Sequence, residues 1–154
     1  MRAANQRGIA FENAAAPPRA ALETVLPLTD HFYFDLKLMD GAKHREYTGA
    51  DNAQILDNAR FLPGRGADIL FRQPLIPGVN DDAENIRATA DFIRSLGRAE
   101  PGLQLIAYHR MGMSKYASLG LPYAMEETLP MPPAQAEAVR AQYEACGIRC
   151  TISK

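Results

Sequence analysis

The sequence lacks three features that would point to common classes of function: an excess of charge of one sign, a long apolar run and a set of cysteines. Its formal net charge is -1, with 17 Lys and Arg against 18 Asp and Glu, which gives no electrostatic basis for binding nucleic acid or an anionic membrane surface. No apolar run approaches the roughly 20 residues of a membrane span, and residues 1–18 hold no continuous apolar segment typical of a secretory signal. We therefore expect a cytoplasmic protein with neither nucleic acid nor membrane as a partner.

The two cysteines, Cys146 and Cys150, lie four residues apart near the end of the sequence. This spacing could indicate a metal or redox pair, but two thiols cannot complete the usual four-ligand site, and the sequence holds no third cysteine. Cys146 falls on the inner face of a predicted helix that Gly147 ends, and Cys150 lies in the apolar run IRCTI. We interpret both cysteines as small core residues and expect no metal site.

The composition is that of a single soluble globular domain, residues 1–154, with 47% hydrophobic and 23% charged residues. Residues 1–8 resemble either an organellar transit peptide or the end of a helix, and we favour the helix. Five short apolar runs then alternate with four helical patterns. The predicted strands cover residues 8–13, 31–37, 67–76, 103–109 and 148–152, and the predicted helices residues 17–28, 51–62, 81–96 and 133–146.

Each predicted helix has an apolar stripe at helical spacing. The third is the best marked, because Asp81 can cap its start, Glu84 stands where a capping box requires an acid, and Gly97 ends it. The residues expected to face the core are Leu22, Val25, Leu26, Ile55, Ala59, Leu62, Ile86, Ala90, Ile93, Leu96, Ala136, Val139 and Tyr143.

Repeated strand–helix alternation predicts an α/β fold of parallel strands with helices outside, either a doubly wound sheet or a barrel. A full eight-stranded barrel takes about 250 residues, and this sequence supplies five strands, the first almost at its start. We therefore expect the C-terminal part of a partial (β/α) barrel, with its N-terminal strands missing.

Polar residues close four of the predicted strands. In parallel α/β folds the ligand site lies at the carboxyl ends of the strands, so these residues are the candidates for a common site. Charges of both signs two residues apart on a strand point the same way, which suits a zwitterionic or polyhydroxylated ligand, whereas the alternative is a structural ion pair. The residues are Glu12 and Asn13, Asp35 and Lys37, Arg72 and Gln73, and Tyr108 and His109.

Two further pairs carry weaker signals. Asp40 and His44 have a spacing that could bind a metal on a helix face, although we favour a solvated helix end. His109 and Lys115 could form an acid–base pair. The sequence has no Ser-His-Asp set, P-loop or Gly-rich dinucleotide turn.

Three motifs occur in order: D-x-K at residues 35–37, R-x-x-x-x-P-G-x-N-D at 72–81 and Y-H-x-x-G-x-x-K-Y at 108–116. Together they resemble the C-terminal half of glycyl-radical-enzyme activating enzymes of the pyruvate formate-lyase activating type, in the radical S-adenosylmethionine superfamily. The match runs from about Gly8 to the end. The resemblance implies a partial (β/α) barrel that holds a 4Fe-4S cluster and S-adenosylmethionine. An electron from the cluster splits this cofactor into methionine and a 5'-deoxyadenosyl radical, which takes a hydrogen atom from a glycine of a partner glycyl radical enzyme.

The same resemblance implies roles for the strand-end residues. Lys37 would reach the methionyl carboxylate, Asp35 would help a neighbouring cation or polar site, and Arg72 would lie near the cofactor. His109 would lie beside the adenosine, and the cofactor-binding pair Glu12 and Asn13 fall near an acidic-plus-hydroxyl pair of the family. Flavodoxin or ferredoxin would be the electron donor, and residues 110–119 would form part of a lid or of the partner-facing surface.

The sequence departs from the family in one decisive respect, because the cluster motif C-x-x-x-C-x-x-C is absent. We therefore expect this chain alone to be catalytically inactive, to bind no cluster, and to bind the cofactor only weakly, if at all. Two alternatives remain: a non-catalytic half-barrel that binds a partner protein, and a cluster-independent barrel enzyme that uses Asp35, Lys37 and His109.

Overall fold

The computed structural model describes residues 10–12, 17–123 and 125–153, with the backbone alone described at residues 11 and 12. The helical end predicted for residues 1–8 and the candidate residue Asn13 lie outside the described residues.

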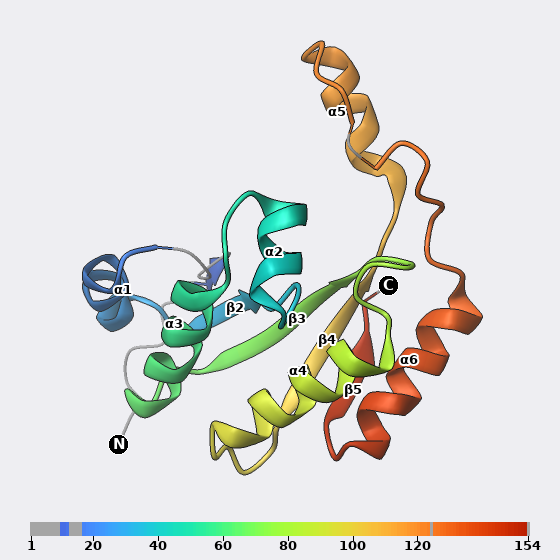
Figure 1. Cartoon of the computed structure of the whole chain (residues 1–154). Helices are drawn as coiled ribbons and strands as arrows, with labels where there is room; N and C mark the ends of the chain where they lie inside the picture. Colours follow the sequence, from blue (N-terminus) through green and yellow to red (C-terminus); the bar gives the residue numbers. More distant parts are fainter. Residues whose placement is uncertain (1–9, 13–16, 124, 154) are drawn as a thin grey trace.

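Strands and helices alternate along the described chain, as predicted (Figure 1). The strands are β1 (Ala10–Glu12), β2 (His31–Asp35), β3 (Ile69–Leu75), β4 (Gly102–Ala107) and β5 (Arg149–Ile152). The α-helices are α1 (Arg19–Val25), α2 (Gly41–Thr48), α3 (Ala53–Gly64), α4 (Ala83–Ser95), α5 (Met113–Ser118) and α6 (Pro133–Ala145), and the 3-10 helices are η1 (Leu26–Leu28) and η2 (Arg110–Gly112).

The strand order in the sheet, β1-β2-β3-β4-β5, is the order along the chain, and each neighbouring pair is parallel. A doubly wound sheet reverses its order at a switch point, whereas successive units of a (β/α) barrel follow one another around the wall. The structure therefore confirms the predicted α/β fold class, a part of a (β/α) barrel with parallel strands, and not the doubly wound alternative.

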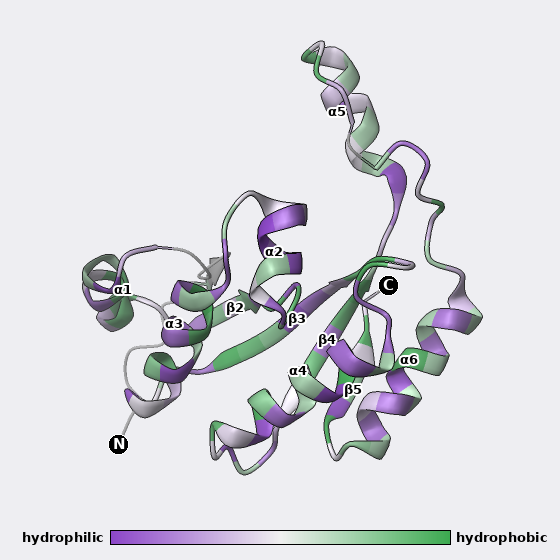
Figure 2. Ribbon diagram, in the orientation of Figure 1, coloured by the Kyte–Doolittle hydropathy of each residue, from purple (hydrophilic) through white to green (hydrophobic). Residues whose placement is uncertain are grey.

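The core lies between the sheet and the helices. Alternate residues of β3 are buried, and Phe71 meets Phe34 of β2 edge to face, with ring centroids 5.7 Å apart. Helix α6 packs against β4 and β5, and α4 packs against α6 (Figure 1). Figure 2 shows hydrophobic colour along these strands and hydrophilic patches on the helices. The predicted core residues are all buried or partly buried against this cluster, and so are Cys146 and Cys150.

Two local predictions are wrong. The N-cap of α4 is Asp82, whose carboxylate accepts a hydrogen bond from the Asn85 N–H at 2.8 Å, and Asp81 instead accepts one from the Gly78 N–H at 2.8 Å. Either of the two adjacent aspartates can cap a helix. Asp81 bonds to the turn at Gly78, whose φ is 72°, and so Asp82 caps α4. Glu84 is therefore not the third helical residue, and the predicted capping box does not form.

Two short helices, α2 and α5, were not among the four helical patterns. Helix α2 buries a single side chain, that of His44, and α5 buries none. The prediction of helices relied on apolar stripes, and therefore it did not identify helices that have no such stripe.

One buried hydrogen bond links the sheet to α6. The hydroxyl of Tyr143 donates to Oε1 of Gln73 in β3 at 2.5 Å, and both side chains have no exposed surface. Burial raises the pKa of Tyr143, so this hydroxyl stays protonated as a donor.

We expect Tyr143→Phe to lower the free energy of unfolding by about 1–3 kcal/mol, because the buried oxygen of Gln73 loses its donor. The measurement is urea denaturation followed by circular dichroism. Tyr47→Phe is the matched control, since the Tyr47 side chain is half exposed and its change is expected to stay within about 0.5 kcal/mol. Equal effects of the two substitutions would contradict the prediction.

Candidate functional site

The sheet has one face covered by helices and one open face, which carries the candidate site. Asp35 lies opposite Arg72 in the β2–β3 pairing, Arg72 opposite Gln104 in β4, and Gln104 opposite Thr151 in β5. Their neighbours along each strand are buried or packed against the core, so the alternation of a strand places these four polar residues on the open face. The open face therefore carries a polar row across the sheet.

An ion pair occupies the β2 end of this row. Both Nε and Nη2 of Arg72 approach Oδ1 of Asp35, at 3.1 and 3.0 Å, and the two side chains are only 13% and 15% exposed. The guanidinium of Arg72 also lies 4.9 Å from the ring centroid of Tyr33, within the range of a cation–π interaction. A carboxylate, a guanidinium and an aromatic ring are thus held together on the open face.

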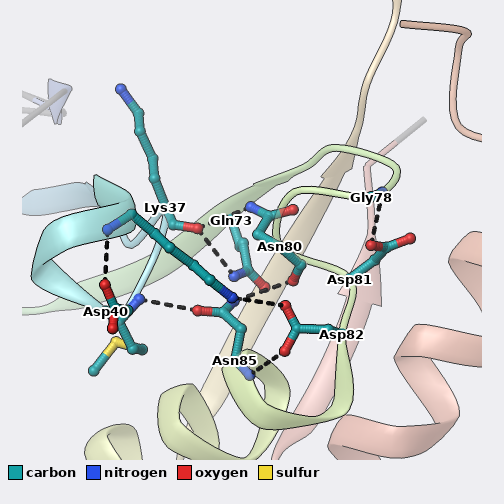
Figure 3. Close-up of polar contacts among 10 residues, drawn as sticks. Lys37, Asp40, Gln73, Gly78, Asn80, Asp81, Asp82 and Asn85 are labelled. Carbon is teal, nitrogen blue, oxygen red and sulfur yellow. Dashed lines mark hydrogen bonds and ion pairs between the residues drawn. The ribbon is translucent and has the colours of Figure 1, made fainter. Parts of the chain in front are cut away.

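Lys37 lies two residues past the end of β2, and Leu36 and Leu38 on either side of it are buried while Lys37 is exposed. The alternation of β2 thus continues to Lys37, which keeps it on the side of Asp35. Within the described residues no carboxylate approaches Nζ of Lys37 to 4.0 Å, and Figure 3 shows this side chain extended away from the polar cluster beneath it.

A cavity of about 360 Å³ lies beside Lys37. Most of its lining is apolar, and the Lys37 side chain brings the only charged group among the described lining residues. The lining consists of Lys37, Leu38, Tyr47, Thr48, Pro74, Ile76, Val79, Asn80, Met125 and Thr128. An apolar cavity with one ammonium at its edge suits a ligand that carries an anionic group.

Arg72 and Gln73 do not end their strand, contrary to the prediction. Strand β3 continues to Leu75, and Gln73 points into the core toward Tyr143. Arg72 nevertheless reaches the open face because of its register with Asp35.

His109 does not join the Asp35–Arg72 pair through any contact that the structure gives for the described residues. Its side chain is exposed and accepts a 3.4 Å hydrogen bond from the Met111 N–H at the start of η2. The neighbouring Tyr108 bonds through its hydroxyl to that of Tyr123 at 3.0 Å, and this hydrogen bond is the main cause that raises the pKa of Tyr123. His109 and Lys115 share no hydrogen bond among the described contacts, and Figure 1 shows α5, which carries Lys115, standing away from the sheet.

The first strand, β1, places the backbone of Glu12 beside β2. The backbone of Glu12 lies opposite Tyr33 in the β1–β2 pairing. Tyr33 is the residue whose ring lies against the Arg72 guanidinium. The side chain of Glu12 is outside the description, and Asn13 lies outside the described residues altogether.

Asp40 and His44 make different contacts and do not form a common site. Asp40 caps α2 by accepting a hydrogen bond from the Lys43 N–H at 2.7 Å. His44 is only 4% exposed, and its Nδ1 lies 2.7 Å from the carbonyl oxygen of Ala50. The interpretation of this pair as a solvated helix end is therefore wrong for His44, because its ring is buried with Nδ1 against a backbone carbonyl.

The two cysteines do not fit an iron–sulfur cluster. Cys146 ends α6 and Cys150 follows in β5, at the amino end of that strand and away from Lys37. Burial raises the pKa of Cys150 to about 12, whereas a cluster is held by thiolates. In the ranges that the structure describes, no group of three or more His, Cys, Asp and Glu side chains could hold a metal ion.

Residues that hold the segment after β2 in place were not singled out from the sequence. They are the buried side chains of Asn52, Gln73, Asn80 and Asn85, which bond to the backbone of residues 37–39. Figure 3 shows three of them, Gln73, Asn80 and Asn85. The signal available was the asparagine within R-x-x-x-x-P-G-x-N-D, which looked like part of a turn.

Among the described residues, no helix is both long enough and apolar enough to cross a membrane.

Comparisons with known proteins give a consistent set of relatives, although no family model matches the sequence. The chain is 43% identical over 117 residues to the (2S)-3-sulfopropanediol dehydratase activating enzyme of Klebsiella oxytoca, which covers 75% of this chain and 37% of that protein. It is 33% identical over 146 residues to the indoleacetate decarboxylase activating enzyme of Tractidigestivibacter scatoligenes, which covers 94% of this chain and 46% of that protein. A crystal structure of a domain of pyruvate-formate lyase-activating enzyme from Bacteroides vulgatus has the same fold, with a TM-score of 0.75 and 23% identity over 94% of this chain and 80% of that one.

The fold and the open face define a parallel α/β unit of the barrel type, with a row of polar residues across its open face. By sequence, this unit is related to the activating enzymes of glycyl radical enzymes, which confirms the resemblance carried by the three motifs. The chain spans less than half the length of these two curated relatives.

We expect the chain to form no stable 4Fe-4S cluster, because it offers two thiols and one of them is buried with a raised pKa. The measurement is absorbance at roughly 410 nm after anaerobic reconstitution with iron and sulfide and then gel filtration. The control is the double variant Cys146→Ser with Cys150→Ser, which reports adsorbed iron. A band that persists in the unaltered chain and disappears in the double variant would contradict the prediction.

Proposed function

We propose that this chain is the C-terminal portion of a glycyl-radical-enzyme activating enzyme, a single incomplete barrel domain that supplies the binding face for S-adenosylmethionine. The observation that supports this most directly is the open face itself. The Asp35–Arg72 pair, Tyr33 and Lys37 lie on the same side of β2 and β3, and the Lys37 ammonium has no carboxylate partner among the described residues.

The chemistry of these side chains suits that ligand. S-adenosylmethionine carries a carboxylate, an ammonium, a sulfonium and an adenosine, so a face with both signs of charge and aromatic groups can bind it. We assign the methionyl carboxylate to Lys37, because this ammonium has no carboxylate partner among the described residues. We assign the Asp35–Arg72 ion pair to polar groups of the same ligand. The remaining proposed cofactor-binding residues are His109, Glu12 and Asn13.

In the complete protein, S-adenosylmethionine together with a 4Fe-4S cluster would supply the radical that removes a hydrogen atom from a glycine of the partner glycyl radical enzyme. The residues that this chain contributes bind and orient the cofactor. Because its two cysteines do not fit the cluster, the chain alone is proposed to be inactive, and flavodoxin or ferredoxin would donate the electron to the complete protein.

The long excursion between β4 and α6 is the part that we propose for contact with the partner enzyme. Several large hydrophobic side chains on it are exposed: Met111, Tyr116, Leu119, Leu121 and Leu129. Figure 1 shows α5 at its far end, away from the sheet rather than over it, which favours a partner-facing role for residues 110–119 over a lid.

We expect the chain to bind S-adenosylmethionine with a dissociation constant of about 1 mM, and Lys37→Ala to weaken binding at least about tenfold, because the carboxylate loses its ion pair. The measurement is equilibrium dialysis with labelled S-adenosylmethionine.

Lys43→Ala is the matched control, since it removes the same charge from an exposed site on α2. It is expected to leave the affinity within about twofold. Equal losses in the two variants, or no binding by the unaltered chain at 10 times the expected dissociation constant, would contradict the proposed function.

A further inference from the structure

We propose that Asn52, Gln73, Asn80 and Asn85, here called the amide cluster, are positioning residues for Lys37. Their carboxamide groups hold the backbone of residues 37–39 at the end of β2 and thereby fix where the Lys37 side chain begins. The assignment of a ligand to Lys37 rests on the proposed function, whereas the positioning itself rests on the contacts alone.

The segment after β2 needs such partners for a physical reason. The last ladder-like bond runs from the Leu36 N–H to the Arg72 carbonyl at 2.8 Å, and from there the chain turns away from β3 toward α2. Leu36 and Leu38 are buried, so the peptide groups around them are shielded from water. A shielded backbone group without a partner is strongly destabilising, and the amide cluster satisfies these groups.

Asn80 is the centre of the cluster. Its Nδ2 donates to the carbonyl oxygen of Lys37 at 2.8 Å and to that of Pro74 at 2.7 Å, and its Oδ1 accepts from the Ile76 N–H at 2.8 Å. This one side chain thus joins the end of β2 to the end of β3 (Figure 3). With 1% of its surface exposed, it makes these bonds without competition from solvent.

Asn85 and Asn52 hold the next residues. Oδ1 of Asn85 accepts from the Met39 N–H at 2.9 Å, and its Nδ2 donates to the Asn80 carbonyl at 3.1 Å, which couples the two asparagines. Nδ2 of Asn52 donates to the carbonyl oxygens of Leu38 and Met39, at 3.0 and 2.7 Å. Every carboxamide in this set is at least nine-tenths buried.

Gln73 ties the same segment to the core. Its Nε2 lies 3.5 Å from the Lys37 carbonyl oxygen, a long hydrogen bond, and its Oε1 accepts the short bond from the Tyr143 hydroxyl. The Lys37 carbonyl therefore meets two carboxamides from two different elements. Residues 37–39 are fixed from β3, from α4 and its preceding turn, and from the start of α3.

The test uses the intact chain and two independent readouts. The first is hydrogen exchange of the Met39 N–H, which Asn85→Ala should accelerate at least about tenfold, while amides in the middle of β3 and β4 keep their rates. The second is the NMR signal of Lys37 after reductive methylation with carbon-13, which Asn80→Ala should shift toward the signal of the exposed Lys115. The Lys43 and Lys115 signals should stay in place, and the amides in the middle of β3 and β4 should keep their slow exchange, which a general loss of structure would not allow.

Asn58→Ala is the matched control. Asn58 is also fully buried, and its Nδ2 donates at 3.0 Å to the carbonyl oxygen of Pro17, a residue that precedes α1 in the chain. It should change neither readout. If Asn80→Ala does not fold, Asn80→Ser serves instead, since it keeps a small polar group at this position while both carboxamide donors are lost.

Unchanged exchange at Met39 in Asn85→Ala, an unmoved Lys37 signal in the Asn80 variants, or equal effects in Asn58→Ala would each overturn the proposal. Neither readout requires S-adenosylmethionine. A chain that fails to bind the cofactor but shows both effects would therefore refute the proposed function and leave the positioning role standing.

Discussion

The register between β2 and β3 is the constraint on which the rest of this structure depends. It sets Phe34 against Phe71 in the core and Asp35 against Arg72 on the open face. A slip of one residue would exchange the two faces, which would bury both charges and expose both rings. The hydrophobic effect and the ion pair therefore favour the same register, and that register creates the polar row that we assign to ligand binding.

The site is completed where regular structure ends. Lys37 lies beyond the last residue of β2, so no ladder holds its backbone, and the buried carboxamides of Asn80, Asn85, Asn52 and Gln73 replace the missing strand partners. An ammonium on a long, flexible side chain loses less freedom on binding when its own backbone is already fixed. The same network reaches Tyr143 in α6 through Gln73. The packing of the last helix therefore contributes to the position of the backbone at Lys37.

The sequence was sufficient to predict the elements whose signals are local. The stripes of α3 and α4, the apolar strand runs and the parallel topology all followed from periodicity, and the three motifs indicated the family. The errors arose where a distant partner decides the outcome. Gln73 looked like a strand end because it is polar, whereas its buried partners, the Tyr143 hydroxyl 70 residues away and the Lys37 carbonyl, explain its burial. His44 looked solvated because its acceptor, the Ala50 carbonyl, depends on the turn after α2.

The sequence predicted that the polar residues of four strand ends lie together, whereas the described contacts join only two of them, Asp35 and Arg72. Asp35 and Arg72 meet, whereas His109 turns into η2 and the side chain of Glu12 is outside the description. Parallel topology brings strand ends to one edge of a sheet, but the direction of each side chain there depends on loops whose conformation single-sequence patterns do not encode. The amide cluster shows the same limit, since its asparagines resemble ordinary turn residues in the sequence.

The central claim is that the open face around Lys37 and the Asp35–Arg72 pair is the cofactor-binding face, and its most direct test is to map the binding position of S-adenosylmethionine. The measurement is a titration of the nitrogen-15-labelled chain followed by amide chemical shifts. If this face binds the cofactor, the largest shifts occur at residues 33–39 and at Arg72 and Gln104. Shifts centred instead on the separate cavity of about 260 Å³ lined by Asp40, Lys43 and Asp82, or spread evenly over the surface, would contradict it.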